Sequence, residues 1–274
     1  MKLNKEAWQL RVNRDGRPLR LPERFLLALC RPVDAPALPV ATYTYTIDNA
    51  LNFARKTVPE LESLIRGKSV LDYGCGPGFQ AVAMARAGAS HVYGLDINQD
   101  WLNAGRSLAE TNGVRNIEFG TAPVSGGYDV VVSLNAMEHY TDPAAELTRM
   151  LSLTRSHVIV SFCELWYSPY GTHLNGTTRL PWLNLLFSDK TIINVRNLYP
   201  DGSDGATRFE EVRGGLNRMT LRRFESMIAG LPEVEVEQFR LRGVKNFNLA
   251  TKLPLLRELF ISSVTCILRH TARN

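Results

Sequence analysis

From about residue 66 onward, short apolar segments alternate with longer segments in which apolar side chains recur at helical spacing. This alternation is typical of α/β proteins with a parallel sheet, in which each helix returns the chain to the start of the next strand. The pattern predicts strands at residues 69–73, 91–95, 116–119, 129–134 and 157–162. It predicts helices at residues 46–64, 79–87, 99–112 and 143–153, the last with Pro143 in its first turn and Thr141 or Asp142 as its cap.

The regular periodicity is lost after the fifth predicted strand. Residues 164–218 are rich in glycine, asparagine, threonine and aromatic side chains. Long connections of this kind within a compact domain tend to be functional lids or binding loops. Beyond them, the pattern predicts a helix at residues 221–230 and strands at 233–239 and 263–268. The chain therefore reads as one α/β domain with a cap or lid insertion after the fifth strand.

The amino-acid composition is that of an ordinary globular protein and excludes only a few classes. With 45% hydrophobic and 22% charged residues in 274, the chain has an ordinary globular composition. No apolar run approaches the roughly 20 residues that cross a bilayer, and no signal-peptide core follows the N-terminus. The four cysteines form no Cys-x-x-Cys pair, so neither zinc nor a disulfide framework is indicated. We expect a cytoplasmic protein without a membrane span.

The net charge of +5 is concentrated at the N-terminus. Residues 1–31 carry eight basic and three acidic side chains, which accounts for the whole excess. One interpretation is an arm that contacts an anion, a nucleic acid or a membrane surface. The other is a solvated extension that packs Trp8, Leu19, Phe25 and Leu26 onto the core. A nucleic-acid partner is not expected, because the basic residues are spread singly and no recognised nucleic-acid module accompanies them.

The first predicted strand runs directly into a glycine-rich turn, Val70-Leu71-Asp72-Tyr73-Gly74-Cys75-Gly76-Pro77-Gly78. Glycines allow the backbone to approach a ligand without interference from a Cβ atom. A nicotinamide fingerprint would require Gly-x-Gly-x-x-Gly. Here the third glycine arrives one residue early, at Gly78, and Phe79 stands where a dinucleotide site needs glycine.

Two carboxylates accompany this turn. Asp72 precedes the first glycine, and Asp96 closes the second predicted strand, where a carboxylate commonly binds ribose hydroxyls. This pattern suits a cationic amino-acid nucleoside better than a pyrophosphate.

These segments resemble motifs I and II of the class I S-adenosylmethionine-dependent methyltransferases, and of the broad type 11 group in particular. Residues 128–143 resemble the strand and helix start that follow in the same family. The resemblance extends over roughly residues 45–270. It implies a Rossmann-like, doubly wound α/β fold whose seven-stranded, mostly parallel sheet has an antiparallel ending. It also implies S-adenosyl-L-methionine as the cofactor and S-adenosyl-L-homocysteine as its product.

The resemblance suggests a division of the chain. We expect a basic N-terminal extension at residues 1–45 and a cofactor-binding core at 46–163. The cap or lid would follow at 164–218, and residues 219–274 would form the C-terminal part of the same catalytic domain.

In the family, the residue at Asp72 helps to hold the cofactor's methionine moiety, and the residue at Asp96 accepts both ribose hydroxyls. One departure concerns adenine: many relatives have an acidic residue after the third strand, where this chain has Thr121. A hydroxyl or a backbone carbonyl can still accept that bond. The expected cofactor-binding residues are Asp72, Gly74, Cys75, Gly76, Gly78, Asp96, Ile97, Thr121, Ala122 and Asn135.

Two histidines are candidates for chemistry. Methyl transfer to a hydroxyl benefits from a general base, a role that suits histidine near neutral pH. His139 follows the fourth predicted strand, at the edge where open α/β sheets bind ligands, and His173 lies in the predicted lid. Both are expected to be catalytic, although a purely structural role for His139 remains open.

A metal is the alternative role for the same histidines. A metal-dependent subset of the family carries Glu-x-x-Glu-His at this place, whereas this chain has Asn135 in the first position, followed by Glu138 and His139. A divalent ion held by these residues and His173 would lower the pKa of an acceptor hydroxyl. Because Asn replaces the first Glu, a metal is possible but not expected.

The predicted lid concentrates aromatic side chains. Trp166, Tyr167, Tyr170, Trp182 and Phe187 fall within 22 residues. We expect Tyr167, Tyr170 and His173 to contact the substrate in a partly aromatic pocket, and Trp182 and Phe187 to pack the lid. The alternative is that the segment simply anchors the lid to the core.

The sequence thus predicts a methyltransferase acting on a small-molecule acceptor, with oxygen as the methylated atom. Methylation of a nucleic-acid or lipid-like acceptor is the rival enzymatic function. The non-enzymatic rival is a partner or regulatory protein that binds S-adenosylmethionine. The acceptor, the metal dependence and the oligomeric state stay open at this level.

Overall fold

The computed structural model describes residues 12–13, 15–33, 46–123, 127–174, 177–232, 234–246, 251, 253–254 and 256–271. Trp8 and much of the predicted basic extension lie outside these residues.

Seven strands of the described chain form one sheet in the order β3-β2-β1-β4-β5-β7-β6. Strands β1 to β5 run parallel, and β7 is antiparallel to both β5 and β6. The predicted doubly wound, mostly parallel sheet with an antiparallel ending is therefore confirmed. The strands are β1 (Ser69–Tyr73), β2 (His91–Leu95), β3 (Ile117–Gly120), β4 (Tyr128–Leu134), β5 (Thr154–Cys163), β6 (Val234–Gly243) and β7 (Ile261–His270).

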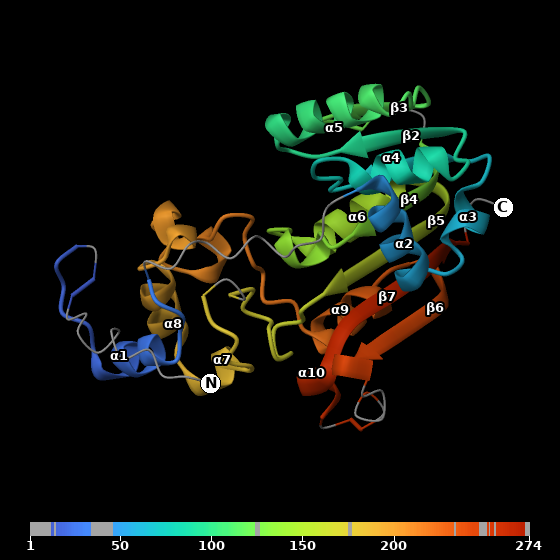
Figure 1. Ribbon diagram of the computed structural model, residues 1–274. Coiled ribbons are helices and arrows are strands. Elements are labelled where there is room, and N and C mark those ends of the chain that lie inside the picture. The colour runs from blue at the N-terminus through green and yellow to red at the C-terminus, as the bar shows by residue number, and fades with distance from the viewer. Residues whose placement is uncertain are drawn as a thin grey trace.

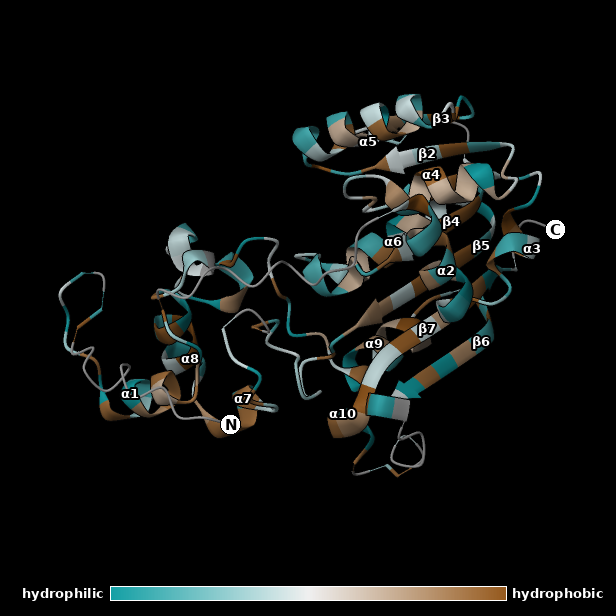
Figure 2. Cartoon of the chain, viewed as in Figure 1, coloured by the Kyte–Doolittle hydropathy of each residue, from teal (hydrophilic) through white to brown (hydrophobic). Residues whose placement is uncertain are grey.

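Successive side chains of the central strands enter opposite cores, as the two-residue period of a strand requires. In β1, Val70 belongs to one buried cluster and Leu71 to the other. The first cluster packs under α2 (Ile47–Thr57), α3 (Leu61–Ile65), α4 (Phe79–Arg86) and α5 (Gln99–Thr111). The second packs under α6 (Pro143–Leu153) and α9 (Leu221–Ala229). Figure 2 shows brown stretches on β4 and β7 and teal on the outer helix α5 and the edge strand β6.

Helix boundaries follow local capping chemistry. Asp142 caps α6 by accepting a hydrogen bond from the Ala145 N–H at 3.1 Å, which satisfies a backbone group that the helix leaves unpaired. The single helix expected at residues 46–64 is wrong, because the chain breaks into α2 and α3 around Pro59. Proline has no N–H and restricts the preceding residue, here Val58, to a non-helical conformation.

A third buried cluster lies outside the sheet. It joins α1 (Leu21–Ala28) to α7 (Leu183–Leu186), α8 (Asp189–Arg196) and η4 (Phe209–Glu211). These last three elements and η3 (Pro200–Asp204) occupy the stretch that lacked periodicity. Leu19 and Leu26 are buried there, as expected, although they pack against this cluster rather than the sheet. Phe25 is an exception to the expected packing, because its side chain is 53% exposed. We call residues 15–33 and 164–218 together the cap; Figure 1 shows it beyond the carboxyl ends of the parallel strands.

Hydrogen bonds tie the two parts of the cap together across long sequence separations. The buried carboxylate of Glu23 accepts hydrogen bonds from Asn194 at 2.6 Å and from Arg17 at 3.3 Å. The hydroxyl of Thr178 donates to the Leu29 carbonyl at 3.2 Å. The remaining short helical elements are η2 (Met137–His139), η5 (Val244–Asn246) and α10 (Arg257–Phe260). No helix among the residues described is long and apolar enough to cross a membrane.

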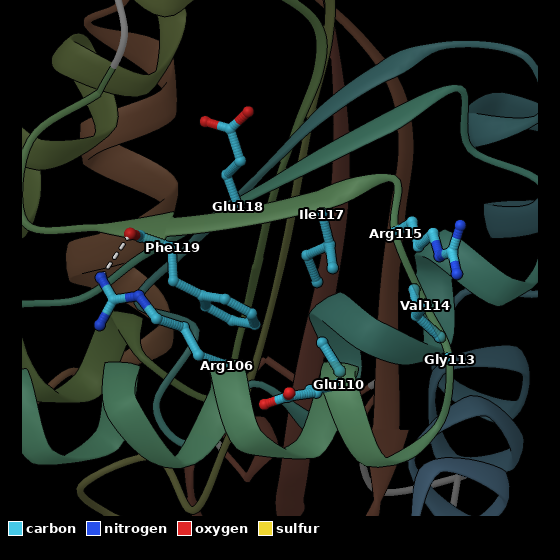
Figure 3. A pocket seen from close by; sticks show the side chains of 9 residues that line it. Arg106, Glu110, Gly113, Val114, Arg115, Ile117, Glu118 and Phe119 are labelled. Carbon is cyan, nitrogen blue, oxygen red and sulfur yellow. Dashed lines mark hydrogen bonds between the residues drawn. The ribbon is translucent and has the colours of Figure 1, made fainter.

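One aromatic ring packs the glycine turn against the neighbouring elements. The Phe119 side chain points from β3 toward α5 (Figure 3). The backbone carbonyl of Phe119 accepts a 2.7 Å hydrogen bond from the side chain of Arg106 on α5. A Cβ added at Gly78, Gly94 or Gly105 would lie 2.5–2.8 Å from this ring. Glycine at these three positions therefore makes room for one buried phenyl group. The pocket of about 580 Å³ drawn in Figure 3 lies at this outer edge of the sheet, between α5 and β3.

Replacing Gly94 with alanine should therefore destabilise the protein by about 1–3 kcal/mol, because overpacking displaces a side chain that has nowhere to move. Urea unfolding would show a lower midpoint with an unchanged slope. Gly230→Ala is the matched control, since its Cβ would meet only ordinary contacts at 3.6 Å. If the two variants were equally stable, the packing argument would be wrong.

Candidate active site

The glycine turn between β1 and α4 adopts a conformation that suits glycine at each of its three positions. Gly74, Gly76 and Gly78 have φ angles of 78°, 53° and 80°. A Cβ at Gly74 would lie 2.8 Å from both Ala136 and the Tyr140 hydroxyl. A Cβ at Gly76 would meet only the ring of Trp101, at 3.9 Å. The middle of the turn therefore presents bare backbone to open space, which is the cradle that a closely bound ligand needs.

Asp96 links this turn to the end of β2. Its Oδ2 accepts a hydrogen bond from the Gly76 N–H at 2.8 Å, and its Oδ1 accepts one from the Asn98 N–H at 2.9 Å. The side chain of Asn98 caps α5, so its main role is structural. Ile97 lies between the two and is 94% exposed, which is unusual for a large apolar side chain. Both carboxylate oxygens of Asp96 thus lie at the edge of the cradle.

Asp72 is a buried carboxylate whose hydrogen-bonding capacity is only partly satisfied. It is 2% exposed, and its Oδ2 has no hydrogen-bond partner among the described residues. Burial, followed by repulsion from the charge of Asp96, raises its pKa to about 7. A buried oxygen without a partner beside an open cradle is suited to a cationic ligand group.

The remaining residues expected at the cofactor lie around the same edge. Thr121 and Ala122 follow β3 and are exposed, and the Ala122 carbonyl accepts a 2.7 Å hydrogen bond from Tyr93. Asn135 follows β4 in a left-handed conformation, with φ at 55°. The Cys75 thiol is buried in the core, where burial raises its pKa, so only the backbone of Cys75 is available to a ligand.

Sequence reasoning missed two aromatic neighbours of the turn. Trp101 faces Gly76 and is 46% exposed, and the only sequence signal for it is a tryptophan in the otherwise polar first turn of α5. Tyr140 donates a 2.9 Å hydrogen bond to the Tyr73 carbonyl and lies 3.0 Å from the Ser133 hydroxyl, behind Gly74. That contact depends on strand pairing, so no local pattern indicates it.

The structure brings the two candidate catalytic histidines together. The His139 and His173 ring centroids are 5.5 Å apart, in an edge-on arrangement. Nδ1 of His139 lies 2.7 Å from the Gly215 carbonyl. Because a carbonyl can only accept, this nitrogen carries the proton, and neutral His139 therefore has its lone pair on Nε2.

The surroundings of His173 disfavour its protonated form. Burial, followed by the nearby charge of His139, lowers the pKa of His173 to about 4. Its Nε2 lies 3.2 Å from Oε2 of Glu164 but without the alignment of a hydrogen bond. We therefore treat His173 as neutral near pH 7 and its contact with Glu164 as dipolar rather than ionic.

Glu138 does not join the histidines in a metal cluster. It is 4% exposed with Oε2 unpartnered in the described structure, and burial raises its pKa to about 8. Within the described ranges, no group of three or more His, Cys, Asp or Glu side chains is arranged to hold a metal ion.

A cavity of about 380 Å³ lies beside the two histidines. His139 and His173 line it, together with several cap residues between Arg196 and Leu216. Tyr167 and Tyr170 are not among its lining residues. Tyr167 is 39% exposed on the loop that follows β5. The assignment of these tyrosines to the substrate remains a prediction.

Comparison with known proteins shows what the part of the chain around this site resembles. Residues 64–187 match the family model described as a methyltransferase domain. This part of the chain is therefore similar to a methyltransferase domain. A putative methyltransferase solved with the Trm112 methyltransferase activator of Haloferax volcanii has the same fold, with a TM-score of 0.51 and 12% identity over 83% of this chain and 94% of that one.

Two curated relatives show how far the sequence likeness extends. The ubiquinone biosynthesis O-methyltransferase of Acinetobacter baylyi is 41% identical over 152 residues, which are 53% of this chain and 58% of that protein. The ribosomal protein L11 methyltransferase of Dechloromonas aromatica is 53% identical over 66 residues, 24% of this chain and 22% of that protein. The chain thus spans little more than half the length of the first relative. The names of the two relatives refer to different methyl acceptors.

Proposed function

We propose that this protein binds S-adenosylmethionine and transfers its methyl group to a hydroxyl oxygen of a small molecule. The observation that carries the proposal is the open cradle at Gly76, bordered by the uncompensated carboxylate of Asp72 and by Asp96. The O-methyltransferase name of the Acinetobacter baylyi relative supports oxygen as the methylated atom.

The residues present fit the cofactor. Asp72 offers a buried acceptor for the ammonium of the methionine moiety, and Asp96 offers two oxygens for the ribose hydroxyls. The exposed Ile97 offers an apolar contact for adenine, with the hydroxyl of Thr121 or a nearby carbonyl as its polar partner.

When bound, the cofactor supplies an electrophilic methyl group on a sulfonium. The task of the chain is to align the acceptor, to exclude water and to accept a proton. We assign the last role to His139, because its Nδ1–H donates to Gly215 and holds the ring with Nε2 available as a base. His173 borders the same cavity, and its pKa of about 4 makes it a weak proton acceptor.

Calorimetric titration with S-adenosylmethionine and with S-adenosylhomocysteine tests the proposal. We expect saturable binding of both in the micromolar range. Failure of both ligands to bind the folded protein would refute it and would favour a protein that keeps the fold without the cofactor.

Affinity for S-adenosylhomocysteine should fall as the pH drops below 7. In the free protein, Asp72 is protonated below its pKa of about 7, whereas the ligand ammonium favours the ionised carboxylate. Binding at low pH must therefore release a proton, and the affinity at pH 6 should be roughly tenfold lower than at pH 7.5. Asp72→Asn should bind weakly at both values; an equal affinity of the wild type at both would contradict this role.

A further inference from the structure

The cavity beside His139 has a composition that indicates what it binds. Its walls include the apolar side chains of Leu174, Phe209, Val212 and Leu216. His139 and His173 stand on one side of it, and Arg213 lines it from the cap. At about 380 Å³, it falls in the size range of sites for small ligands.

The charge of Arg213 is not neutralised by its acidic neighbours. Asp204 is occupied by Arg196, which donates to both of its oxygens at 2.7 Å, and this pairing holds the pKa of Asp204 well below its usual range. Glu210 is paired with Arg218 at 3.2 Å and Glu211 with Arg208 at 2.8 Å. Among the residues that the structure describes, no ion pair involves Arg213.

The backbone around Arg213 is fixed at two points. Its own N–H donates to Oδ2 of Asp204 at 2.8 Å. Two residues further on, the Gly215 carbonyl accepts the 2.7 Å hydrogen bond from His139. Gly214 and Gly215 both have positive φ, which allows the tight turn between the two anchors. The backbone of the turn that carries the exposed Arg213 is therefore held at a set place relative to the candidate base.

We propose that this cavity is the acceptor site and that the acceptor is a hydroxyaryl carboxylate. Its ring would pack against the apolar walls, its hydroxyl would face His139, and its carboxylate would pair with Arg213. In the reaction the acceptor oxygen bonds to the methyl carbon as the carbon–sulfur bond breaks, and the hydroxyl proton goes to Nε2 of His139. This inference rests on the proposed methyl transfer and adds the class of acceptor.

The test compares 4-hydroxycinnamate with its methyl ester, which keeps the ring and hydroxyl but removes the charge. Calorimetry with saturating S-adenosylhomocysteine should show the acid binding at least about tenfold more tightly than the ester, as expected for one charged hydrogen-bonded contact. Arg213→Gln should abolish that preference and leave the ester and S-adenosylhomocysteine unaffected. Arg222→Gln, an exposed arginine on α9, is the matched control and should behave as the wild type.

The outcomes separate this inference from the proposed function. Equal binding of acid and ester, no millimolar binding of the acid, or a preference that survives Arg213→Gln would each overturn the acceptor assignment. In all three cases, intact binding of S-adenosylhomocysteine would leave the proposed function standing. If the wild type did not bind S-adenosylhomocysteine, both the acceptor assignment and the proposed function would be refuted.

Discussion

Replacing Asp96 with alanine is expected to weaken the binding of S-adenosylmethionine by about 100-fold or more, because hydrogen bonds to a charged group contribute roughly 1.5–3 kcal/mol each and two are lost. The carboxylate also accepts hydrogen bonds from the N–H groups of Gly76 and Asn98. The variant should remain folded, since the sheet and its cores do not depend on this side chain. Calorimetry with circular dichroism measures both properties.

Two further variants show which role of Asp96 matters. Asp96→Asn keeps an oxygen for the Gly76 N–H but loses the charge, so it should bind better than the alanine variant and worse than the wild type. Asp100→Ala, an exposed acidic residue in the first turn of α5, should bind normally. Normal affinity of Asp96→Ala would refute the cofactor-site assignment.

Replacing His139 with alanine should lower kcat by about 100-fold, the lower end of the range for loss of a general base, with S-adenosylhomocysteine affinity unchanged. Added imidazole should restore part of the rate, because it can enter the space that the side chain leaves. His173→Ala should have a smaller effect, since the low pKa of about 4 makes His173 a weak base. Steady-state kinetics with a hydroxyl-bearing acceptor that the wild type methylates provide the measurement.

His91 serves as the control for this series, because it begins β2, at the end of that strand opposite Asp96. His91→Ala should retain the full rate. If His139→Ala also kept the full rate, or if imidazole gave no recovery, His139 would be a structural residue whose contact with Gly215 holds the cap.

Local sequence was sufficient for the sheet and the cofactor edge. The strands that begin at Ser69 and His91 were predicted with the bounds they have, because parallel strands buried on both faces form short apolar runs. The glycine turn and Asp96 were recognisable because the turn needs a residue type that tolerates positive φ, and because the carboxyl ends of neighbouring parallel strands meet at one edge.

What the sequence by itself determined is therefore the α/β architecture, the resemblance to methyltransferases and the placement of Asp72, Gly76 and Asp96 at the ends of neighbouring strands. Only the tertiary structure decided the tautomer of His139, the unpaired charge of Arg213 and the packing of residues 19–30 against residues 164–218 within the cap. The physical reason is the separation along the sequence of the groups that interact. Strand periods and turn glycines depend on neighbours a few residues away, whereas the bond between Thr178 and Leu29 joins groups 149 residues apart. Such contacts leave no local pattern in either segment.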